Sequence, residues 1–259
     1  MIKAIKERPS PNFDHRPAGR RVEMLILHYT GMTSAAAALD RLCDPAAKVS
    51  AHYMIEEDGT VWRLVPEAMR AWHAGVAFWR GERDINGLSI GIELVNPGHE
   101  FGYRPFPELQ MAALETLARD ILARHPIPPD QVLGHSDVAP SRKLDPGELF
   151  DWPRLARAGI GLWPDGFPPG GAGRYSIAAP LGPDGPAADN LAAEEIAEAQ
   201  RGLARLGYEI AETGKLDAAT RCVVQAFQRH FRPERVDGVP DAETRHRLAR
   251  LLAQLGRSA

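Results

Sequence analysis

The apolar run at residues 22–29, VEMLILHY, constrains the fold of this 259-residue chain more than any other segment. Short and almost continuous runs of strand-forming apolar residues are typical of strands buried inside a sheet. The run ends in His28 and Tyr29. It therefore predicts a central strand that carries a histidine at its carboxyl end.

Further segments supply neighbours for this strand. Strand patterns occur at residues 52–55, 61–65, 89–95 and 132–135, and helical patterns occur at residues 34–42 and 108–124. The Asp58-Gly59 pair predicts a turn that joins the first two of these strands as a hairpin. Within residues 89–95, the alternation of side chains places Glu93 on the face opposite Ile92. Strands interleaved with helices predict an α/β domain with a mixed central sheet flanked by helices.

The organisation changes near Trp163. The following residues are dense in proline and glycine, which is typical of a linker. Beyond them lie three helical patterns that are too short to share the first core by any obvious route. We therefore predict four parts: an N-terminal extension (1–20), an α/β domain (21–163), a linker (164–190) and a small all-α domain of three helices (191–259).

Composition disfavours some classes of partner and location. Lys plus Arg total 31 and Asp plus Glu total 34, so a net charge of −3 gives no reason to expect nucleic-acid binding. No segment approaches the roughly 18 apolar residues of a membrane span, and the charged N-terminus lacks the apolar stretch of about 7 to 15 residues in a secretory signal. Cys43 and Cys222 are expected to be plain buried thiols.

Three residues are candidate metal ligands: His28 at the end of the central strand, and His135 with Asp145 in the segment GHSDVAPSRKLDPG. A hydrolytic zinc site takes three ligands from histidines and carboxylates and leaves a fourth position for water. Glu93 can act as general base on that water, and Lys143 can stabilise an oxyanion. Together these residues indicate a metal-assisted amide hydrolase.

Each histidine alone is weaker evidence, because nine are present and a histidine at a strand end is often structural. His52 is expected to lie in a strand at the edge of the site without binding metal. Four further histidines are expected to be solvated at the surface: His99, His125, His230 and His246.

Five motifs occur in the order LILHYTGM, SAHYMIEEDGTVWRLVPE, AWHAG, SIGIELVNPG and GHSDVAPSRKLDPG. In this order they resemble the type 2 N-acetylmuramoyl-L-alanine amidases, relatives of peptidoglycan recognition proteins and of bacteriophage T7 lysozyme. The resemblance covers residues 20–163 and implies the mixed α/β fold of those proteins.

The resemblance also implies roles for individual residues. It implies one zinc ion per chain, held by His28, His135 and Asp145, with Glu93 as proton acceptor and Lys143 as transition-state stabiliser. Substrate contacts are implied at Tyr29, Thr30, Trp72 and His73.

Members of this family cut the amide bond between the lactyl group of N-acetylmuramic acid, ordinary or anhydro, and L-alanine of the stem peptide. The implied partners are therefore peptidoglycan fragments, namely muropeptides and anhydro-muropeptides, met in peptidoglycan recycling or turnover. The segments LARLGY and GKLDAATRCVVQAFQRHF resemble the three-helix peptidoglycan-binding domain of the AmiD-like branch. An amidase without an export signal fits the AmpD-like branch, so a cytoplasmic location is expected, or a periplasmic one if the natural chain is longer.

Two other functions remain open at this point. The chain could be a peptidoglycan recognition module without catalysis, or a zinc peptidase that cuts the stem peptide. The intact ligand positions and Glu93 favour catalysis, and the contexts HYTGM and RKLDPG favour the amidase.

Overall fold

The computed structural model describes residues 5–167 and 191–257, and a six-stranded sheet forms the centre of the first range. Its strands, in order across the sheet, are β1 (Lys6–Glu7), β5 (Val61–Arg63), β4 (Tyr53–Ile55), β7 (Ser89–Leu94), β3 (Met24–Tyr29) and β8 (Val132–Gly134). Strands β4 and β5 pair antiparallel, and the other neighbours are parallel. The expected strands are confirmed, as is the hairpin that turns at Asp58 and Gly59.

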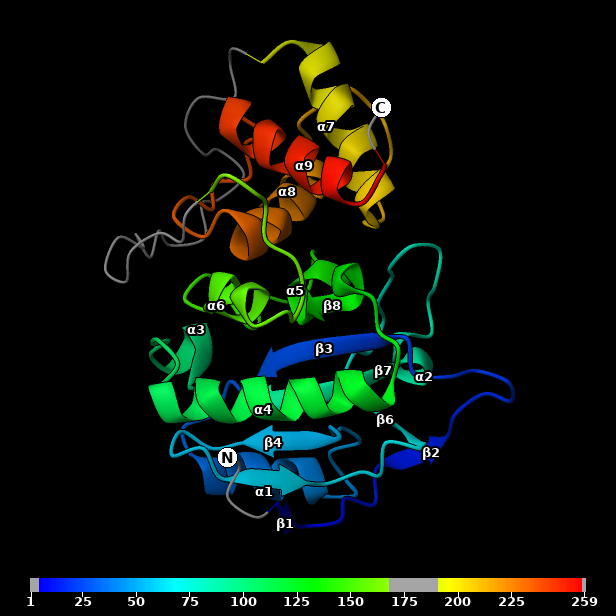
Figure 1. The fold of residues 1–259 in the computed structure, drawn as a ribbon, viewed down its shortest axis with the longest axis vertical. Coiled ribbons are helices and arrows are strands. Elements are labelled where there is room, and N and C mark those ends of the chain that lie inside the picture. The colour runs from blue at the N-terminus through cyan, green and yellow to red at the C-terminus, as the bar shows by residue number, and fades with distance from the viewer. Residues whose placement is uncertain (1–4, 168–190, 258–259) are drawn as a thin grey trace.

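Helices cover both faces of this sheet (Figure 1). Helix α4 (Glu108–Arg124) lies across one face and packs in a buried cluster with Leu25 and Leu27 of β3. Helix α1 (Ala35–Cys43) packs on the other face against Met54 of β4. Both helices are confirmed by the structure, and together they bury the sheet on two sides.

The strand register decides which residues share the α1 face. Met54 of β4 is the partner of Glu93 on β7, and Glu93 is in turn the partner of His28 on β3. Partners directly opposite one another in a sheet point to the same side. The polar residues His28 and Glu93 therefore project from the face that Leu25 and Leu27 leave free.

Several short elements go beyond what the sequence patterns predict. They are α2 (Ile85–Leu88), α3 (Gly98–Phe101), η1 (Pro129–Gln131), α5 (His135–Val138), α6 (Trp152–Arg157) and a two-stranded sheet of β2 (Phe13–His15) with β6 (Met69–Ala71). The described part of the N-terminal extension, residues 5–20, is built into the fold, because Arg16 donates hydrogen bonds to the carbonyl oxygens of Gly87 and Ser89 at 2.9 and 2.8 Å.

Residues 191–257, here called the C-terminal module, contain the three expected helices. These are α7 (Ala193–Leu206), α8 (Ala218–Phe231) and α9 (Ala242–Gln254). Asp217 and Asp241 cap α8 and α9 by accepting hydrogen bonds from the backbone N–H groups of Thr220 and Thr244. The linker expected at residues 164–190 lies mostly outside the described residues.

The C-terminal module shares its core with the α/β domain, so the expectation of a separate core is wrong. One buried cluster contains Ile26 of β3 and Leu133 of β8 together with Leu203 of α7 and Phe227 of α8. Figure 1 shows the three helices stacked against the part of the α/β domain that contains α5, α6 and β8. Three short helices bury little apolar surface alone, and sharing a cluster compensates for this.

No helix among the described residues is long and apolar enough to cross a membrane. Cys43 and Cys222 are free thiols, and each is partly rather than fully buried.

Candidate metal centre and active site

Parallel strands bring the candidate residues to one end of the sheet. His28 is the last residue but one of β3, and Glu93 occupies the matching position of β7. Strand β8 stops at Gly134, and His135 follows directly as the first residue of α5. The carboxyl ends of parallel strands are a common place for sites in open α/β sheets.

The three candidate ligands converge on one point. His28 Nδ1 lies 2.9 Å from His135 Nδ1, and each of these nitrogens lies 3.0 Å from Asp145 Oδ2. All three residues are buried, and their ligand atoms lie within 4.8 Å of one another. Lone pairs this close repel unless a proton or a cation lies among them. Two imidazoles and one carboxylate are also a donor set that zinc prefers.

The contact made by Nε2 of His135 fixes the tautomer of the ring. His135 Nε2 lies 3.0 Å from the carbonyl oxygen of Ala74, which can only accept a hydrogen bond. A neutral His135 therefore carries its proton on Nε2, and Nδ1 is left with a free lone pair directed at Asp145.

His73 contacts the ring nitrogen of His28 that does not face the other two candidate ligands. His28 Nε2 lies 3.0 Å from His73 Nδ1, and His73 Nε2 lies 3.1 Å from the hydroxyl of Ser89. The imidazole of His73 fits only because residue 91 is glycine, since a Cβ there would come within 2.5 Å of the ring. Burial, and after it the proximity of His135, lower the pKa of His28 to about 4. His28 is therefore neutral near pH 7.

Asp145 is carried to the two histidines by a closed loop. The backbone N–H of Ser136 donates to the carbonyl oxygen of Asp145 at 2.9 Å, which joins the loop end to the start of α5. Burial alone would raise the pKa of Asp145, but the proximity of His135 and His28 outweighs burial and holds this pKa below the ordinary value. Asp145 is thus the anionic member of the site.

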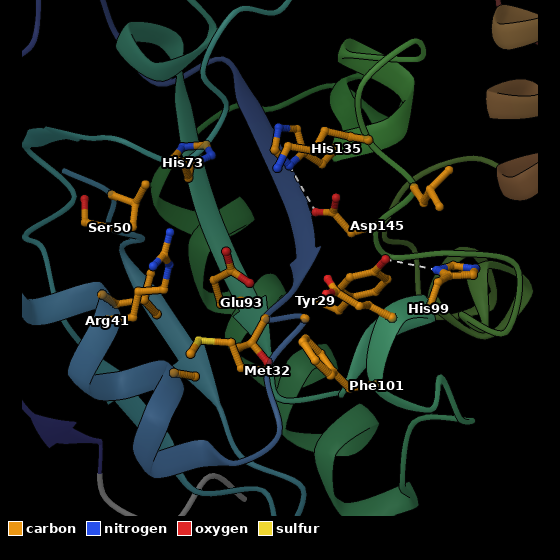
Figure 2. A pocket seen from close by; sticks show the side chains of 18 of the residues that line it. Tyr29, Met32, Arg41, Ser50, His73, Glu93, His99, Phe101, His135 and Asp145 are labelled. Carbon is orange, nitrogen blue, oxygen red and sulfur yellow. Dashed lines mark hydrogen bonds and ion pairs between the residues drawn. The ribbon is translucent and has the colours of Figure 1, made fainter. Parts of the chain in front are cut away.

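Glu93 and Lys143 lie at the same pocket. Figure 2 shows the carboxylates of Glu93 and Asp145 pointing into the space that His135 also faces. Glu93 Oε2 is buried and has no hydrogen-bond partner among the described residues. Burial, and after it the charge of Asp145, raise the pKa of Glu93 well above its ordinary value, while Lys143 opposes this.

The pocket has a volume of about 810 Å³, and all the sequence-predicted site residues except His28 line it. His28 is buried and is not among the lining residues. Tyr29 and Thr30 form one wall, where the hydroxyl of Tyr29 lies 2.9 Å from His99 Nδ1. Trp72 and His73 line the pocket as well, but both ring nitrogens of His73 already contact protein.

The sequence patterns do not identify other lining residues, of which Arg41 is the clearest case. Arg41 lies in the last turn of α1, is exposed and lines the pocket. Figure 2 shows it across the pocket from Tyr29. In the sequence Arg41 is an ordinary charged residue between Leu39 and Leu42, and only the packing of α1 on the sheet reveals its place.

The remaining histidines differ from expectation in most cases. His52 precedes β4 rather than lying in it, and it is buried outside the pocket lining, where its Nδ1 accepts the N–H of Gly91 at 3.0 Å. His246 is exposed as expected. Three histidines expected in solvent are at least partly buried instead: His99, His125 and His230.

Two known protein families match this chain, one in the α/β domain and one in the C-terminal module. The model of the family Amidase_2, N-acetylmuramoyl-L-alanine amidase, matches residues 18–148, and that of the peptidoglycan-binding domain family PG_binding_1 matches residues 192–248. AmiD, an N-acetylmuramoyl-L-alanine amidase of Escherichia coli, is 38% identical over 98% of this chain and 92% of its own length. The 1,6-anhydro-N-acetylmuramyl-L-alanine amidase AmpD of Haemophilus influenzae is 34% identical over 60% of this chain and 91% of its own.

Solved structures agree over almost the full length. The complex of E. coli AmiD with the substrate anhydro-N-acetylmuramic acid-L-Ala-D-gamma-Glu-L-Lys has a TM-score of 0.74 and 36% identity, covering 97% of this chain and 94% of that chain. AmpDh3 from Pseudomonas aeruginosa, in complex with an anhydromuramic pentapeptide, has a TM-score of 0.74 and 34% identity, covering 98% of each chain. The expected fold, a mixed sheet flanked by helices with an all-α C-terminal part, is confirmed.

Proposed function

Because the chain belongs to the N-acetylmuramoyl-L-alanine amidase family, we propose that it hydrolyses the amide bond between the lactyl group of N-acetylmuramic acid and L-alanine of the stem peptide. We propose the anhydro form as substrate, since two similar solved proteins, AmiD and AmpDh3, hold anhydromuramic peptides. The reaction belongs to peptidoglycan recycling or turnover. The convergence of His28, His135 and Asp145 within 4.8 Å is the observation that carries the proposal.

We propose that these three residues hold one zinc ion per chain. The donor set fits, because both Nδ1 atoms face the carboxylate and His135 is fixed in the tautomer that leaves Nδ1 free. Bound there, zinc supplies a water molecule whose pKa falls to around 7. His73 contacts Nε2 of His28 and keeps this ring in place, which gives His73 a positioning role in addition to any substrate contact.

Glu93 is the proposed general base. Its buried Oε2 has no hydrogen-bond partner among the described residues, so it is free to accept a proton from the attacking water and pass it to the amide nitrogen that leaves. Desolvation makes this carboxylate a stronger base than an exposed one. The ammonium group of Lys143 lines the same pocket and stabilises the negative oxygen that forms on the amide carbon.

The pocket walls are proposed to bind the two halves of the substrate. Tyr29, Thr30 and Trp72 offer hydroxyl groups and an indole ring to the muropeptide. Among the described residues Arg41 forms no ion pair, and its exposed guanidinium suits a carboxylate of the stem peptide. The catalytic part is proposed to span residues 21–163, with residues 191–259 as the peptidoglycan-binding-like part.

One incubation tests the reaction. The protein is mixed with an anhydro-muropeptide, and the products are identified by mass spectrometry. We expect free stem peptide and anhydro-N-acetylmuramic acid, and we expect neither from Glu93→Ala at equal zinc content. A shortened stem would identify a peptidase instead, and an unchanged ligand that remains bound would identify a recognition module; either result contradicts the proposal.

The cytoplasmic location stays a prediction. It would be checked by fractionating the source cells and probing each fraction with an antibody to the protein. Recovery in the periplasmic or membrane fraction would contradict it without affecting the proposed reaction.

A further inference from the structure

Asp137 connects the candidate metal centre with the C-terminal module. It lies in α5, two residues after His135, and is only 1% exposed. Its Oδ2 accepts a hydrogen bond from the backbone N–H of Gly134 at 2.8 Å. Because Gly134 ends β8 and His135 begins α5, this bond fixes the turn from which the His135 side chain projects.

Both oxygens of Asp137 also accept hydrogen bonds from the C-terminal module. The hydroxyl of Tyr208 donates to Oδ1 at 2.6 Å. His230 Nδ1 lies 2.7 Å from Oδ2, and because a carboxylate oxygen only accepts, this nitrogen carries the proton. Tyr208 and His230 are each 2% exposed. Short bonds of this kind to a buried charged acceptor are among the stronger ones in proteins.

The two donors are themselves held by packed rings. The imidazole of His230 stacks on Trp152 of α6, with ring centroids 3.7 Å apart and planes 19° apart. The ring of Tyr208 meets Trp79 edge to face at 4.9 Å. Neither donor can turn away from Asp137 without breaking these contacts, so both are fixed in direction as well as in distance.

We propose that Tyr208 and His230 are positioning residues of the metal centre: by holding Asp137 they fix the turn at Gly134 and thereby the direction of His135 Nδ1. The inference rests on the proposed zinc site. It gives the C-terminal module a part in the amidase site that is separate from any binding of peptidoglycan by the module.

The competing explanation is that these bonds only dock the module, and the interface offers matched controls. The ion pair of Arg83 with Glu209 crosses the same interface and involves neither Asp137 nor His135. Leu203 of α7 belongs to the shared buried cluster but forms no bond to Asp137. Glu209→Gln and Leu203→Ala therefore weaken the docking of the module while leaving Asp137 its two donors.

The test uses full-length Tyr208→Phe and His230→Leu, with His230→Asn as the conservative variant, since an asparagine amide can replace the Nδ1 donor. Zinc affinity is measured by competition with a chelator, the Co²⁺-substituted protein is followed by visible absorption, and the Tm of each metal-free protein is recorded. We expect Tyr208→Phe and His230→Leu to bind zinc about 10- to 100-fold more weakly and to alter the Co²⁺ spectrum. His230→Asn should recover most of the affinity.

Leu203→Ala should lower the Tm yet keep the zinc affinity and the Co²⁺ spectrum of the wild type. Wild-type affinity and spectrum in both Tyr208→Phe and His230→Leu would overturn the inference, and so would an equal loss of zinc in Leu203→Ala. A wild-type protein that binds no zinc would instead overturn the proposed metal centre, so the two failures are distinguishable.

Discussion

His28 on β3 and Glu93 on β7 are direct partners in the register of two adjacent parallel strands. The candidate ligand and the candidate base are therefore placed by the backbone hydrogen bonds of the sheet centre rather than by a loop. A slip of one residue in either strand would turn one of the two side chains to the opposite face. The buried cluster under α4 opposes such a slip, because it needs Leu25, Leu27 and Ile92 on that face.

Glu93→Gln should lower kcat by about 10²- to 10⁴-fold, because the amide cannot accept the proton of the attacking water. The zinc content should not change, since Glu93 is not among the three converging donors. Steady-state kinetics on a muropeptide, with elemental analysis of the same samples, checks both points. A variant that keeps the wild-type kcat would exclude Glu93 as the base.

The raised pKa of Glu93 predicts how stability depends on pH in the metal-free protein. The folded state binds this proton more tightly than the unfolded state. Glu93 therefore lowers the free energy of unfolding as the pH rises from 4.5, the ordinary pKa of the carboxyl group, through the raised pKa of the folded state. Glu93→Gln should therefore raise the Tm at pH 8, and the gain should shrink as pH falls towards 4. Thermal unfolding with a chelator across this range is the measurement; an equal or lower Tm at pH 8 would speak against a desolvated carboxylate.

Lys143→Met should act on the chemical step. The ammonium group would be needed when the negative oxygen forms, so kcat should fall by about 10²- to 10³-fold while KM changes little. The two constants are obtained from one substrate titration of each protein. A rise in KM with unchanged kcat would show that Lys143 binds the ground state instead.

Arg41→Gln should act on binding. If the guanidinium meets a carboxylate of the stem peptide, its loss raises KM and leaves kcat close to that of the wild type. Arg21→Gln is a matched control, because Arg21 is an exposed arginine that does not line the pocket. On a substrate whose stem carboxylates are amidated, the wild type and Arg41→Gln should have the same KM. If Arg41→Gln raised KM by the same factor on the amidated and on the free-acid substrate, the contact would be refuted.

The sequence predicts the parts of the fold that leave a periodic or local signal. The central run at residues 22–29 and the alternation around Glu93 identify β3 and β7, and aspartates before apolar helical patterns identify the starts of α8 and α9. The three candidate ligands stand in motifs, so their positions could be proposed before their geometry was known.

Long-range contacts leave no such signal. The hydrogen bonds of Asp137 reach partners that lie 71 and 93 positions away in the chain. The sequence around Tyr208 and His230 does not reveal whether either side chain is buried or exposed. His230 was therefore expected at the surface although it is buried. The shared cluster of the C-terminal module escapes the sequence for the same reason, because amphipathic helices do not reveal what their apolar faces contact.

A zinc titration decides between a metal-dependent hydrolase and the other possibilities. The purified protein is stripped with a chelator, zinc is returned in steps, and free peptide released from an anhydro-muropeptide is measured at each step, with Asp145→Ala alongside. We predict no release without metal, a linear rise that levels off at one zinc per chain, and no recovery in Asp145→Ala at the same zinc concentration. Full release by the metal-free protein, or equal recovery in Asp145→Ala, would contradict a zinc ion held by His28, His135 and Asp145.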